Sequence, residues 1–284
     1  VYDKRNEIGG NIMTYEEKLQ QYKDWIFRRS AYQMALAIIG IDKQTVAPSA
    51  GAAYRDERSA YLAGELFSIE TDPAMVQLLK ELKDDPKIDG DNKRAVELYY
   101  KQAMDTMCIP KEEFVAYQKL RDESFDAWIK AKSQSDYSIF EPYLKKIIEV
   151  SKKMYRYRNS DKNLYDQMLD DYEPGMTQEK YDVFFAALKE RLVPLIQKVT
   201  KAKQKNEEFL HQEFPIEDQK KFMTQLLEYL HFDSSWGYQN ESEHPFTSWT
   251  CENDCRTTTK YVKNDVVSAV LSTVHEVGHA YYEH

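Results

Sequence analysis

Apolar side chains recur every three or four residues along most of this 284-residue chain. That spacing places them on one face of a helix, so it predicts a succession of amphipathic helices. Pro48 with Gly51, and Ile109 with Pro110, interrupt the pattern because proline and glycine break helices. The predicted helices cover about 14–40, 53–68, 92–107, 111–131, 138–158, 177–206 and 215–231, and another opens at about 71–73.

The pattern changes after residue 231. Residues 232–243 are polar and are predicted to form a loop, whereas 245–249 and 255–262 are rich in β-branched and aromatic side chains and predict a β-hairpin. Strand alternation would place Arg256, Thr258 and Lys260 on one face of it and Thr257, Thr259 and Tyr261 on the other. Asn264 and Asp265 then offer a cap for a last helix, on which valines and leucines return at helical spacing.

Composition supports a mainly α fold, a multi-helix protein with a small β-hairpin or sheet beside the last helix. There are only 9 Gly and 9 Pro, fewer than a sandwich or a parallel α/β sheet needs for its turns. The net charge of -9 argues against a nucleic-acid or anionic-membrane partner. Three cysteines make no disulfide framework and favour the cytoplasm, and no apolar run is long enough for a membrane span. Residues 1–12 are interpreted as a tag or upstream sequence.

The chemistry lies on the last predicted helix, in the run from His275 through Glu276 to His279. Histidines four residues apart project from one helix face, so both imidazoles can bind one zinc ion. Glu276 follows the first histidine and would act as general base during attack by water. The alternative is a pair of histidines on an ordinary core helix.

A catalytic zinc site needs three protein ligands and one open position. His284 lies on the same predicted helix but off the face of the histidine pair. Cys251 and Cys255 could bind a metal together, although reduced hairpin cysteines are the simpler interpretation. The sequence therefore predicts two metal ligands, His275 and His279, and no third protein ligand within the chain.

Three ordered motifs resemble the carboxypeptidase Taq (M32) family of metallocarboxypeptidases. The family's His-Pro-Phe motif is matched by His244 to Phe246, its Asp-x-Arg-x-Thr motif by Asp254 to Thr258, and its His-Glu-x-x-His motif by His275 to His279. Residues 236–240 depart from the family's usual approach to His-Pro-Phe, which leaves the peptide preference open. The family's third metal ligand, a downstream Glu, has no counterpart here.

The resemblance implies a gluzincin-like helical fold and the removal of C-terminal residues from peptides, with Zn²⁺ or alternatively Co²⁺, in a homodimer. His244 and Arg256 would bind substrate, and Asp254 and Thr258 would support them; a structural ion pair is the alternative for Asp254 and Arg256. Residues 13–231 would form the lid and groove wall, and 232–284 the start of an incomplete catalytic region.

We therefore expect the N-terminal part of a longer enzyme, inactive alone because its site lacks a ligand. Two alternatives remain. One is a helical zinc endopeptidase or dipeptidyl carboxypeptidase, which cleavage of a C-terminally amidated peptide would indicate. The other is a non-catalytic helical fragment or a subunit of a split enzyme, which co-purification with a second fragment would favour.

Overall fold

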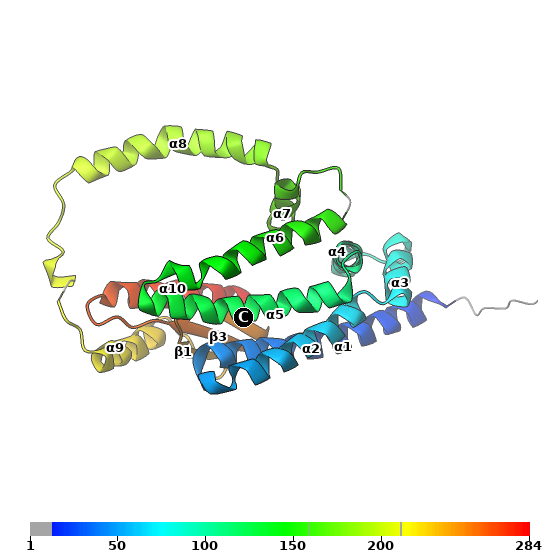
Figure 1. Ribbon diagram of the computed structural model, residues 1–284, viewed down its shortest axis with the longest axis horizontal. Coiled ribbons are helices and arrows are strands. Elements are labelled where there is room, and N and C mark those ends of the chain that lie inside the picture. Colours follow the sequence, from blue (N-terminus) through cyan, green and yellow to red (C-terminus); the bar gives the residue numbers. More distant parts are fainter. Residues whose placement is uncertain (1–12, 159, 211) are drawn as a thin grey trace, which may run out of the picture. The chain divides into compact units, whose positions relative to one another are not determined.

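The computed structural model describes residues 13–158, 160–210 and 212–284, so the predicted tag or upstream segment 1–12 lies outside it. It is mostly helical with one small sheet, which confirms the predicted fold class (Figure 1). The helices are α1 (Tyr15–Thr45), α2 (Ala52–Glu70), α3 (Pro73–Asp84), α4 (Gly90–Met107), α5 (Lys111–Gln134), α6 (Glu141–Tyr157), α7 (Leu164–Tyr172), α8 (Gln178–Lys201), α9 (Ile216–Tyr229) and α10 (Val266–Glu283). Among the described residues, no helix is both long and apolar enough to cross a membrane.

The chain divides into two compact units, the first of which comprises residues up to 33 together with 58–119. Its core joins one end of α1 to α3 and α4, with Leu79, Leu82 and Val96 fully buried. The indole of Trp25 donates to Ile69 O at 2.9 Å, which satisfies its polar atom inside the core. Asp72 begins α3 by accepting a hydrogen bond from Ala74 N, with Pro73 in the first turn.

The second unit comprises residues 34–57 and 120–284. Within it, the buried ammonium of Lys43 lies 2.9 Å from an oxygen of Asp56, 3.6 Å from one of Asp122 and 3.5 Å from one of Asp126. These groups come from α1, α2 and α5. The network therefore fixes three helix segments against one another around a single cation.

The sheet of the second unit has three strands, β1 (Gly237–Glu241), β2 (Thr247–Cys251) and β3 (Asp254–Thr259), in the order β1-β3-β2. β2 and β3 pair antiparallel, so the predicted hairpin is confirmed. The predicted loop over 232–243 is wrong in part, because β1 pairs parallel with β3. The polar sequence of β1 did not indicate a strand, because its inward-facing residue is Gln239 and not an apolar one. The amide of Gln239 donates to the hydroxyl of Thr273 at 3.3 Å. The helix α7 was also not predicted.

Helix α10 packs on one face of the sheet, and a small core lies between them. Phe232, Cys255, Val277 and Ala280 are its buried members. Alternation along β3 turns Cys255, Thr257 and Thr259 toward α10, and Thr259 Oγ1 donates to Ala269 O at 3.3 Å. The core fixes the helix that carries the histidine pair.

Candidate active site

The histidine pair lies one turn apart on α10, which begins where Asp265 accepts a hydrogen bond from Ser268 N at 2.9 Å. His275 Nε2 and His279 Nε2 are 3.1 Å apart, and the two ring planes are nearly perpendicular, at 88°. Both rings are exposed, whereas Glu276 between them is only 7% exposed. Two imidazole nitrogens thus converge on one point at the surface of the helix.

This spacing fits a shared divalent metal ion. Zinc–nitrogen bonds of 2.0–2.1 Å in tetrahedral geometry put two ligand nitrogens about 3.3 Å apart. The observed separation of 3.1 Å is close to that value. Among the described residues, however, no group of three histidine, cysteine or carboxylate side chains is placed to hold a metal.

Two of the other candidate ligands, His284 and Cys255, are engaged elsewhere. The His284 ring stacks on Trp236 at 4.0 Å between centroids, and its Nδ1 lies 2.8 Å from Glu252 O. Burial raises the pKa of the Cys255 thiol, so this residue is a neutral part of the core. These contacts agree with the sequence-based interpretation of both residues.

The carboxylate of Glu276 is held by Thr247, the first residue of β2. Thr247 Oγ1 lies 2.6 Å from Glu276 Oε2 and 2.9 Å from the Glu276 carbonyl oxygen. Sequence reasoning did not single out Thr247. In the structure Thr247 is the register partner of Thr257, so both side chains share the face toward α10.

The segment from His244 to Phe246 is anchored through its backbone. Phe246 N donates to Thr258 Oγ1 at 2.9 Å, and Thr258 N donates to Phe246 O at 2.9 Å. Ser242 Oγ lies 2.6 Å from Thr258 Oγ1 and 2.7 Å from His244 O. Thr258 thus holds the backbone of this segment. Its supporting role and the substrate role of the exposed His244 side chain stay predictions.

Asp254 and Arg256 form a two-point ion pair, with Arg256 Nε and Nη2 at 2.7 and 2.8 Å from the two carboxylate oxygens. The hydrogen bonds from Arg256 hold the pKa of Asp254 below its usual range, and Thr250 adds another at 2.9 Å. Arg256 pairs in register with Ser248 and alternates with Thr257, so it lies on the sheet face opposite α10. The structure thus places Arg256 in the hairpin brace, and its substrate role stays a prediction.

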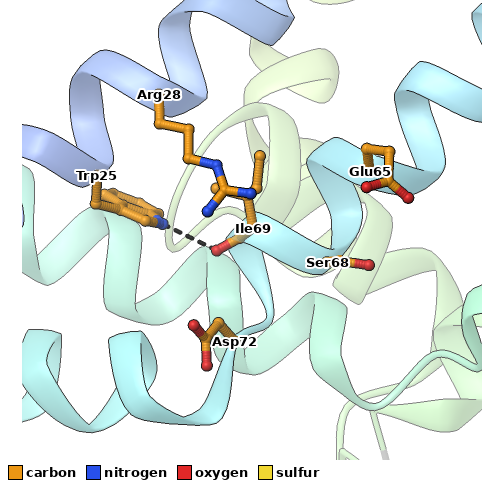
Figure 2. Close-up of a pocket in the computed structure, with 6 residues that line it drawn as sticks. All are labelled: Trp25, Arg28, Glu65, Ser68, Ile69 and Asp72. Carbon is orange, nitrogen blue, oxygen red and sulfur yellow. Dashed lines mark hydrogen bonds between the residues drawn. The ribbon is translucent and has the colours of Figure 1, made fainter.

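A pocket of about 200 Å³ lies in the first unit, lined by Trp25, Arg28 and Asp72 among others (Figure 2). Its carboxylates already have partners: Glu65 is 3.6 Å from the ammonium of Lys111, and Asp72 caps α3. None of the predicted site residues lines it. The candidate active site is therefore the face of α10 with the adjoining strand β2.

Comparisons with known proteins identify the family of the chain. The family model described as Carboxypeptidase Taq (M32) metallopeptidase matches residues 21–284. Carboxypeptidase 1 of Bacillus subtilis is 37% identical over 276 residues, covering 96% of this chain and 54% of that protein. Thermostable carboxypeptidase 1 of Thermus thermophilus is 30% identical over 270 residues, covering 90% of this chain and 53% of that protein.

Solved structures give the same result at the level of the fold. The crystal structure of BsuCP matches with a TM-score of 0.89 at 35% sequence identity, covering 93% of this chain and 54% of that chain. This chain therefore spans about half the length of the curated relatives it matches.

Proposed function

The chain belongs to the carboxypeptidase Taq (M32) metallopeptidase family, and from that premise we propose that it forms part of a zinc carboxypeptidase active site. His275 and His279 would hold the ion, and Glu276 would be the general base. The observation that carries the proposal is the 3.1 Å separation of the two imidazole nitrogens beside a buried carboxylate. The substrates would be peptides with a free C-terminus.

When bound, a divalent metal would polarise the scissile carbonyl and make water a stronger acid. Glu276 would take the proton from the attacking water on its carboxylate and pass it to the leaving amine. His244, on the segment held by Thr258, would stabilise the developing charge on the carbonyl oxygen. The chain would thus supply the general base and a group that stabilises charge, and would hold both in place.

We further propose that the third protein ligand lies outside these 284 residues. Catalytic zinc sites use three protein ligands, and the described residues bring only two, His275 and His279, to this point. Two ligands leave the coordination short, so the chain alone would bind zinc weakly and release no C-terminal residues.

The test measures zinc binding to the chain by isothermal titration calorimetry and amino-acid release from a short peptide by mass spectrometry. We expect weak zinc binding that H275A and H279A each abolish and that E276Q keeps, with no amino-acid release. Zinc binding unaffected by H275A and H279A would rule out the metal pair. Tight equimolar binding with turnover would rule out the missing ligand, and turnover on a C-terminally amidated peptide would indicate an endopeptidase.

A further inference from the structure

Among the described residues, the buried carboxylate of Glu276 has a single hydrogen-bond partner, Thr247. A threonine hydroxyl has one proton to donate. Its 2.6 Å contact with Glu276 Oε2 falls in the range of charge-assisted O–H···O⁻ bonds, whereas the 2.9 Å contact with the Glu276 carbonyl oxygen is longer. The hydroxyl proton therefore points to Oε2.

This arrangement makes the two carboxylate oxygens inequivalent. Oε2 is occupied by Thr247, and within the described part of the chain no hydrogen bond reaches Oε1. A carboxylate on a flexible side chain would otherwise rotate and exchange its two oxygens. With Oε2 held by the sheet, Oε1 is the oxygen available to a proton on water.

Thr247 also connects two parts of the site. It directly follows Phe246, whose backbone is held on both sides by Thr258. The hydroxyl of Thr247 then reaches α10, so a continuous set of contacts joins the His244 segment to the carboxylate of Glu276.

We propose that Thr247 is a positioning residue, which fixes Glu276 through Oε2 so that Oε1 accepts the proton from water. The inference rests on the proposed role of Glu276 as general base. Within the described part of the chain, the side-chain hydroxyl of Thr247 hydrogen-bonds only to Glu276. Its hydroxyl acts only through the carboxylate it orients.

The register of the sheet supplies a matched control. Thr257 lies directly opposite Thr247, is 1% exposed, and its hydroxyl has no hydrogen-bond partner among the described residues. T257V therefore removes a buried hydroxyl from the same row without touching Glu276. T247S keeps the hydroxyl of Thr247 and removes only its methyl group.

The first experiment determines crystal structures of the chain and of its T247V, T247S and T257V variants. We expect the Glu276 carboxylate to leave its position in T247V, to return to it in T247S, and to be unchanged in T257V, with His275 and His279 in place throughout. If T247V does not fold, T247A removes the same hydroxyl and is compared in the same way. A Glu276 carboxylate that keeps its position without the hydroxyl would overturn the proposal.

The second experiment places these substitutions in the complete, metal-loaded enzyme. We expect kcat to fall about ten- to hundredfold in T247V, as for a misplaced catalytic group, with KM within about twofold. T247S should recover most of the loss, and T257V should match the wild type. An unchanged kcat in T247V, or no recovery in T247S, would overturn the positioning role. Lack of activity in the wild type and in every variant would refute the peptidase proposal instead. The crystal structures would still test whether Thr247 positions the Glu276 carboxylate.

Discussion

The ion pair of Asp254 and Arg256 shows at the residue scale how one motif can brace a site. The two residues are neighbours on one face of β3, and Thr250 from β2 joins the same carboxylate. Hydrogen bonds from Arg256 lower the pKa of Asp254, and the same pairing raises the pKa of Arg256. Because both side chains are about 30% exposed, solvent screens the pair, and its contribution to stability is modest.

This lowered pKa predicts a dependence of stability on pH. An Asp with a depressed pKa stabilises the fold fully above its unfolded value of about 3.9, and the contribution is lost as the pH falls through the folded value. We therefore expect the free energy of unfolding of the wild type to fall more steeply than that of D254N between about pH 5 and pH 2. Urea denaturation at a series of pH values measures this, and parallel pH profiles for the two proteins would contradict it.

Single residues were predictable where their relation is local. His275, Glu276 and His279 lie within one helical turn, so their spacing alone places two imidazoles on one face. Thr247 was missed because its partner lies 29 residues away, in another element. Neither spacing nor composition carries that relation; it arises only when the hairpin packs on α10.

At the scale of elements, the sequence predicted the helices and strands whose apolar residues recur with a strong periodicity. The long helices and the β2–β3 hairpin could be predicted because their apolar positions recur at regular spacing, and the structure confirms them. Strand β1 has no such pattern, since Tyr238 is exposed and Gln239 is satisfied by Thr273. Its existence depends on parallel pairing with β3, a tertiary relation.

Substitution of two glycines in these elements by alanine is expected to change the free energy of unfolding in opposite directions. A Cβ at Gly237 would lie 2.5 Å from Phe232 Cζ, whereas a Cβ at Gly278 would meet nothing within 4 Å. We expect G237A to lower the free energy of unfolding by about 1–3 kcal/mol, the usual cost of overpacking. G278A should raise the free energy of unfolding by up to about 1 kcal/mol, because alanine has a higher helix propensity than glycine at an exposed helix position. Chemical denaturation of both variants measures this, and equal effects would contradict the packing argument.

At the scale of the whole molecule, α8 differs from the other long helices because none of its residues is buried. Its large aliphatic and aromatic side chains from Val183 to Val199 are between 39% and 71% exposed. Contiguous apolar surface of this kind marks an interaction face or a tendency to aggregate. The sequence predicted the helix but not its exposure, because the pattern of apolar residues along a helix does not identify the surface that packs against them.

We predict that the chain alone self-associates through this face of α8. Sedimentation velocity over a range of concentrations should show a rise in average mass for the wild type. L195Q with I196Q should reduce that rise while changing the free energy of unfolding by less than about 0.5 kcal/mol, since both side chains are half exposed. The control, K189Q with K198Q on the same helix, should associate like the wild type. A wild type that stays monomeric, or a double variant that still associates, would show that α8 is not the contact.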